Sequence, residues 1–205
     1  MDVWYASYGS NLLKERFLAY IYGGMPLGSD RSEQGARDKT PPKSDERIDM
    51  PFPLYFSKNK SKWGKGGVAF IGTDSSPKVN TIGRMYLITE EQFLDVVSQE
   101  NGGMDMSLNL DEVQEKGFVD IHDGWYNRIV YVGERYGAPI FTFTSSHSLY
   151  HVFFTTPSVA YLSVITKGLL EIGLTLNEAI EYLLLKKGID GEFTRDSLRD
   201  YLGWD

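Results

Sequence analysis

One stretch near the N-terminus constrains the fold of this chain more than any other. Residues 3–8 (Val-Trp-Tyr-Ala-Ser-Tyr) are aromatic or small, which predicts a buried strand. After Gly9 the pattern becomes helical, with spacings of three and four among Leu12, Leu13, Arg16, Phe17, Tyr20 and Ile21. A strand therefore runs through a Gly-Ser-Asn turn into a helix whose first N–H groups lack internal partners. This turn favours a small anion such as a carboxylate or phosphate, because the helix dipole is positive there. In a plainer interpretation, Ser10 or Asn11 only caps the helix.

Strands dominate the middle of the chain and helices its end, which predicts the α+β class. Residues 23–53 are rich in Gly, Pro, Ser and charges and predict a long loop, either partly ordered over a pocket or disordered. A capping box at Thr89 opens a helix that Asn101 and two glycines stop near Glu100, and residues 104–117 predict a loop with at most a turn of helix. Further strands are predicted at residues 54–56, 68–71, 81–88, 126–132 and 140–144, the first two as a hairpin. Residues 157–205 predict C-terminal helices that begin at Ser158, Thr175 and Thr194.

Composition narrows the classes of partner. The 205 residues suffice for a single domain over 1–205. A net charge of −7 argues against nucleic acid, which needs a concentrated basic face, so we expect a small-molecule substrate. The chain has no Cys, which excludes thiolate nucleophiles and fits a reducing compartment. No apolar run approaches the roughly 20 residues of a membrane span. The sequence therefore predicts a cytoplasmic protein without a membrane partner, and it leaves the oligomeric state open, a homodimer included.

Several motifs resemble the gamma-glutamylcyclotransferase-like family. The first is Tyr8-Gly9-Ser10-Asn11-Leu12, and the second is the strand at 83–88 followed by a helix that ends in Gln99-Glu100-Asn101-Gly102. Residues 63–69 and 157–162 agree further, so the resemblance covers most of the chain in the expected order. Three features depart from the family: Asn101, where many relatives have Gly, and the long loop at 23–53 and the C-terminal helices, which exceed the most compact members.

The resemblance implies a small mixed β-barrel with surrounding helices and a reaction that needs no metal or cofactor. A γ-glutamyl amide, from a γ-glutamyl amino acid, peptide or amine, would be converted to 5-oxoproline and a free amine. Glu100 would be the general acid and base, and the turn from Tyr8 through Gly9, Ser10 and Asn11 to Leu12 would bind the substrate's carboxylate. The identity of the leaving amine stays open.

Glu100 also stands out on physical grounds. A carboxylate in the last turn of a helix faces the negative end of the dipole, which disfavours its charged form, and any burial would disfavour the charged form as well. Such a Glu is suited to exchange a proton near neutral pH. The alternative is a solvated residue at a helix end, as most Glu are.

Two other function classes compete with this interpretation. One is a binding module that keeps the pocket without turnover. The other is a serine hydrolase with Ser10 as nucleophile, although Tyr8 and Leu12 stand where the elbow pattern G-x-S-x-G needs glycine. Its base would have to come from His122, His147 or His151. His147 and His151 have helical spacing for a metal, but residues 149–154 look more like a strand, which disfavours that site.

Overall fold

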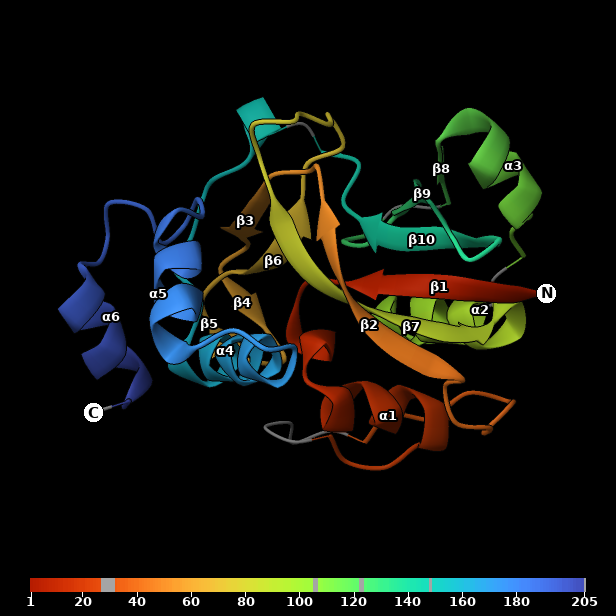
Figure 1. Ribbon diagram of the computed structural model, residues 1–205, viewed down its shortest axis with the longest axis horizontal. Coiled ribbons are helices and arrows are strands. Elements are labelled where there is room, and N and C mark those ends of the chain that lie inside the picture. The colour runs from red at the N-terminus through yellow and green to blue at the C-terminus, as the bar shows by residue number, and fades with distance from the viewer. Residues whose placement is uncertain (27–31, 105–106, 122–123, 148, 205) are drawn as a thin grey trace.

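A six-stranded mixed sheet forms the centre of the computed structural model, which describes residues 1–26, 32–104, 107–121, 124–147 and 149–204 (Figure 1). Strand β1 (Asp2–Ser7) lies in the middle, antiparallel to β7 (Thr81–Thr89) and parallel to β10 (Ala138–Thr144). The order across the sheet is β2-β7-β1-β10-β9-β8, with β2 at Ser44–Met50, β9 at Arg128–Arg135 and β8 at Phe118–Asp120. Pairing on both sides holds β1 rigidly in place.

The side chains of β1 alternate between two cores, as the two-residue period of a strand requires. Val3 and Tyr5 face a core that contains α1 (Lys14–Tyr22) and α2 (Glu90–Glu100). Trp4 and Ala6 face a second core, which contains the antiparallel pair of β3 (Leu54–Ser57) and β6 (Val68–Ile71) and helix α4 (Val159–Glu171). The short hairpin of β4 (Lys60–Ser61) and β5 (Gly64–Lys65) connects β3 to β6.

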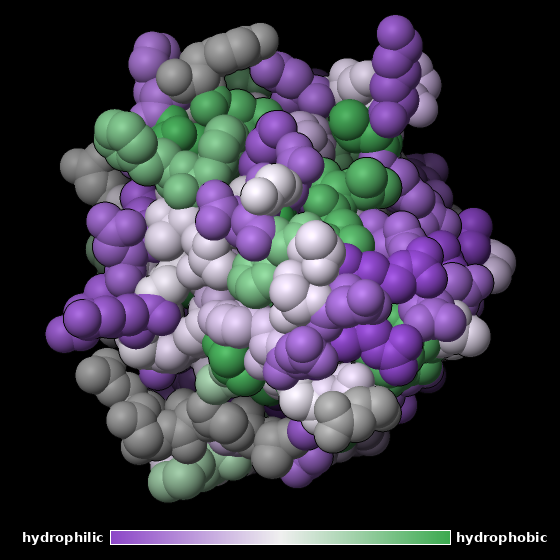
Figure 2. Space-filling model, turned by 90° about the vertical axis from the view of Figure 1, so that its left-hand side faces the viewer, coloured by the Kyte–Doolittle hydropathy of each residue, from purple (hydrophilic) through white to green (hydrophobic). Residues whose placement is uncertain are grey.

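The C-terminal helices lie toward the left of the view in Figure 1, at the end of the molecule away from α2. After α4 follow α5 (Leu176–Leu184) and α6 (Arg195–Leu202), and all three begin at the predicted caps Ser158, Thr175 and Thr194. The face seen on this side carries apolar residues next to strongly hydrophilic ones (Figure 2). Within the described residues, no helix is long and apolar enough to cross a membrane.

The α+β class predicted from the sequence is confirmed, and the predictions fail in three segments. Residues 44–50 form edge strand β2 instead of loop, because they pair with β7 although most of them are polar. Residues 110–116 form helix α3 (Leu110–Lys116), which Asn109 caps, and β8 follows it. Residues 149–151 form the 3-10 turn η2 (Leu149–His151) instead of strand. Residues 27–31 of the predicted long loop lie outside the described part.

Candidate active site

A cavity of about 320 Å³ lies at the carboxyl end of β1, where the two cores meet. Segments far apart in sequence line it: the end of β1 with the turn that follows, the β4–β5 hairpin, the end of α2, strand β6 and helix α4. Tyr8, Gly9, Ser10 and Asn11 are among the lining residues, and so is Glu100. The structure therefore brings the two predicted motifs together in one cavity.

The turn after β1 is the 3-10 turn η1 (Ser10–Leu12). The amide of Leu12 donates to the Gly9 carbonyl at 3.0 Å, and helix α1 begins at Lys14 after Leu13, without a side-chain cap. The interpretation of Ser10 or Asn11 as a helix cap is therefore wrong. Leu12 also departs from the prediction, because its side chain packs in the core and it does not line the cavity.

Groups behind η1 hold it in place. The Tyr86 hydroxyl donates to the Asn11 carbonyl at 2.8 Å, and the Arg84 guanidinium donates to the Leu12 carbonyl at 3.3 Å. Arg84 in turn pairs with Asp45 at 2.5 Å and Glu171 at 2.7 Å. This network ties the turn to β7, β2 and α4, so the backbone that faces the cavity is fixed from behind.

Asn11 connects the turn to Glu100. Its side-chain amide donates to Oε1 of Glu100 at 3.3 Å and to the Tyr5 hydroxyl at 3.2 Å. Asn11 is 3% exposed, and its Oδ1 has no hydrogen-bond partner among the residues that the structure describes. A buried acceptor of this kind can receive a hydrogen bond from a donor in the cavity, such as an ammonium group.

Glu100 is the last residue of α2, as predicted, and its side chain is only 11% exposed. The interpretation of Glu100 as a solvated helix-end residue is therefore wrong. Burial, and next the charge of Glu100, raise the pKa of Tyr5 above its usual value. Tyr5 consequently keeps its proton and remains a hydrogen-bond donor beside the carboxylate.

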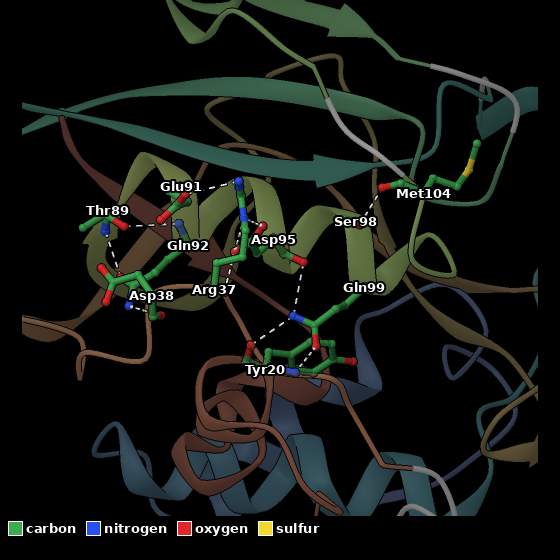
Figure 3. Close-up of polar contacts among 11 residues, drawn as sticks. Tyr20, Arg37, Asp38, Thr89, Glu91, Gln92, Asp95, Ser98, Gln99 and Met104 are labelled. Carbon is green, nitrogen blue, oxygen red and sulfur yellow. Dashed lines mark hydrogen bonds and ion pairs between the residues drawn. The ribbon is translucent and has the colours of Figure 1, made fainter.

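Hydrogen bonds on two sides of α2 fix the position of its end. The Gln99 amide donates to the Tyr20 carbonyl at 3.0 Å and accepts from the Gly35 amide at 2.9 Å, while Arg37 pairs with Asp95 (Figure 3). On the other side, Asn101 donates through Nδ2 to the carbonyls of Val97 and Tyr126, at 3.0 and 3.1 Å. Asn101, which stands where many members of the family have Gly, thus ends helix α2 and links it to the segment before β9.

Aromatic rings form the opposite wall of the cavity. The Tyr161 hydroxyl accepts from the Ala69 amide at 3.1 Å, and a Cβ at Gly9 would lie 3.0 Å from the same oxygen. Gly9 thus allows the turn to approach α4 closely. Trp63 packs on Tyr161 with ring centroids 5.0 Å apart, and the Arg16 guanidinium stacks on Trp63 at 4.4 Å.

Sequence reasoning missed a cation in the cavity. Lys62 lies between β4 and β5, and its Nζ is 3.7 Å from Oε2 of Glu100. The same Nζ donates to the Tyr20 hydroxyl at 2.6 Å and to Glu33 at 3.1 Å. The available signal was the run of lysines around Trp63 in the sequence.

The histidines give the hydrolase alternative no support. No His occurs among the described residues that line the cavity with Ser10, and His122 lies outside the described part. His147 and His151 are exposed. The described residues contain no group of three or more His, Cys, Asp or Glu that could hold a metal ion.

The chain is similar to a curated protein by sequence and to several solved structures by fold. No protein-family model matches the chain. Histone deacetylase 5 from Arabidopsis thaliana is 37% identical over 209 residues, a match that covers 89% of this chain. The chain spans only 30% of that relative's length, so the relative's name describes a much longer protein.

Two of the similar solved structures match over almost the whole chain. A structure described as gamma-glutamyl cyclotransferase matches with a TM-score of 0.54 and 18% identity, covering 100% of both chains. A structure described as an uncharacterized protein from Homo sapiens matches with a TM-score of 0.51 and 18% identity, covering 98% of both chains. At this identity the likeness establishes the fold.

Proposed function

We propose that this chain, which has the gamma-glutamyl cyclotransferase fold, converts a γ-glutamyl amide to 5-oxoproline and a free amine. The likeness confirms the fold that the sequence predicts. One observation carries the proposal: Asn11 and Glu100, 89 residues apart in sequence, are hydrogen-bonded within one cavity. This contact supports the proposal because the turn that would bind the substrate's carboxylate and the buried Glu100 that would move the proton then reach the same substrate.

The turn would bind and orient the substrate. The backbone amides of Gly9, Ser10 and Asn11 would hold the α-carboxylate, in the manner of a helix N-terminus that binds an anion. Asn11 Oδ1 would then accept a hydrogen bond from the α-ammonium group, which is bonded to the same carbon as the carboxylate. Both contacts would place the amine beside Glu100, so that the attack becomes an intramolecular step with a fixed geometry.

Glu100 would move the proton. The α-ammonium cannot attack until it loses a proton, which Glu100 would remove. The amine would then form a bond to the γ-carbonyl carbon, and the bond from that carbon to the leaving nitrogen would break. Glu100 would return this proton to the leaving nitrogen as that bond breaks and would take the second proton from the new ring nitrogen, so that 5-oxoproline and a neutral amine result; the second proton then passes from Glu100 to the released amine or to water. Tyr5, which stays protonated, is a donor for the oxygen of the attacked carbonyl.

The test is the variant Glu100→Gln, assayed by release of 5-oxoproline from a panel of γ-glutamyl amino acids, peptides and amines. Gln keeps the shape of Glu but cannot exchange a proton, so kcat should fall by roughly 100-fold or more while KM changes little. Glu91→Gln is a matched control, because Glu91 belongs to the same helix but is half exposed and pairs with Arg37. Its turnover should equal that of the wild type.

Two outcomes would contradict the proposal. Turnover of Glu100→Gln at the wild-type rate would show that Glu100 is not the acid and base. If the wild type binds γ-glutamyl compounds by calorimetry but releases 5-oxoproline from none of them, the chain is a binding module.

A further inference from the structure

Lys62 is a cation in the cavity that the proposed reaction does not use. Its ammonium group lies 3.7 Å from Glu100 and donates to Glu33 and Tyr20, so it lies near any substrate atom beside Glu100. The Lys62 side chain is 25% exposed, whereas those of Glu33 and Glu100 are 12% and 11% exposed. The Lys62 side chain therefore lies closer to solvent than the two carboxylates that it contacts.

The chain segment that carries Lys62 is positive although the chain as a whole is acidic. Residues 58–65 carry lysines at positions 58, 60, 62 and 65 and no Asp or Glu, while the net charge of the chain is −7. Lys60 and Lys65 are exposed on the β4–β5 hairpin beside the cavity. A local positive patch of this kind attracts anions and repels cations that approach the opening.

Glu33 is held in position to neutralise Lys62. Its backbone pairs with Gly24, with N–H to carbonyl distances of 3.0 and 2.8 Å in the two directions. The amide of Gly35, two residues further on, donates to the Gln99 side chain of α2. The Gln99 side chain in turn donates to the Tyr20 carbonyl of α1 (Figure 3). The Glu33 carboxylate thus occupies a place beside Lys62 that another carboxylate can take.

We propose that Lys62 determines specificity by binding a carboxylate on the leaving group in exchange for Glu33. This inference rests on the proposed function, because it assigns the part of the substrate that leaves. The preferred substrates are γ-glutamyl compounds whose leaving group is an amino acid or a peptide with a carboxylate close to the scissile amide. A leaving amine without that carboxylate gains nothing from Lys62, and a cationic amine is repelled by it.

The experiment compares γ-glutamylalanine with γ-glutamylethylamide, which differ only in the carboxylate of the leaving group. Because Lys62 gives up its bond to Glu33 in the exchange, the net gain is that of an ordinary hydrogen bond, which corresponds to a preference of roughly 2- to 10-fold in kcat/KM for γ-glutamylalanine in the wild type. Lys62→Met should abolish the preference by raising KM for γ-glutamylalanine, and Lys62→Arg should keep part of the preference. Lys65→Met, an exposed lysine of the same hairpin, is the matched control and should keep the whole preference. Glu33→Gln should lower KM for γ-glutamylalanine, because Lys62 then has no counter-ion to give up.

Two results would overturn the inference while the proposed function stands. One is a wild type that turns over both compounds with equal kcat/KM. The other is a Lys62→Met variant that loses kcat equally on both compounds, since Lys62 would then act through Glu100 and not on the leaving group.

Calorimetry separates this inference from the proposed function. If no compound yields 5-oxoproline, the proposed function fails, and binding of the same two compounds decides about Lys62. Tighter binding of γ-glutamylalanine that Lys62→Met abolishes supports the carboxylate site, and equal binding of both compounds overturns it.

Discussion

The substitution Gly168→Ala tests whether helix α4 controls the geometry of the turn that lines the cavity. Gly168 lies where α4 crosses η1, and a Cβ there would be 2.5 Å from Leu12 Cβ and 2.6 Å from both Leu12 C and Leu13 N. Carbon atoms in contact are about 3.5–4.0 Å apart, so η1 would have to move by about 1 Å. Two of the three contacts are with backbone atoms, so a change of side-chain rotamer cannot relieve them.

Two opposing terms set the expected stability. Overpacking of a core costs about 1–3 kcal/mol, whereas replacing Gly by Ala in a helix stabilises by about 1 kcal/mol. We therefore expect the free energy of unfolding to fall by about 1 kcal/mol. The effect on turnover should be larger, because a displacement of about 1 Å in a positioning group can reduce the rate by about 100-fold.

The assays are urea unfolding and 5-oxoproline release, with Lys167→Ala as the matched control. Lys167 is the exposed neighbour of Gly168 in the same helix, so its substitution should leave both quantities close to those of the wild type. A Gly168→Ala protein that is about 1 kcal/mol more stable than wild type, with unchanged turnover, would show that α4 does not restrict the turn.

Two further predictions concern stability. Arg84→Met should lower the free energy of unfolding by about 3 kcal/mol. This is the lower end for a broken buried ion pair, because the partners Asp45 and Glu171 are 20% and 41% exposed. The control Arg47→Met breaks a surface ion pair and should change the free energy of unfolding by less than about 1 kcal/mol, and equal losses for both variants in urea unfolding would refute the argument. Burial lowers the pKa of Lys186 from 10.5 to about 8, so the unfolded chain binds the proton more tightly between these pH values. The free energy of unfolding of the wild type should therefore rise relative to Lys186→Met from about pH 8 to pH 10.5, with Lys187→Met as the exposed control, and a difference that does not vary with pH would contradict this.

The elements that the sequence predicts correctly depend on local interactions. At Thr89 both bonds of the capping box form, the side chain accepting from the Gln92 amide and the Gln92 side chain accepting from the Thr89 amide. The start of α2 is therefore encoded within four residues. Its end at Glu100 follows from Asn101 and the glycines after it in the same way.

The elements that the sequence misses depend on distant partners. Strand β2 reads as a charged loop, yet it forms because each of its residues pairs with β7, as in Arg47 opposite Arg84. An edge strand with a polar exposed face has no alternating apolar pattern to reveal it. For the same reason the contact of Lys62 with Glu33 was not predictable, because two distant segments meet only in the folded chain.

The candidate site depends on β1 more than on either motif. Tyr5 belongs to the core around α1 and α2, whereas Tyr8 belongs to the core of β6 and α4, and both line the cavity. Glu100 therefore arrives from one side of the sheet, and the Tyr161 hydroxyl near Gly9 from the other. Since β1 is paired with β7 along its length and with β10 at Trp4 and Tyr5, the distance between these groups is fixed by rigid elements and not by loops. A substitution that weakens the pairing of β1 should therefore reduce turnover even where the local structure of η1 and α2 is unchanged.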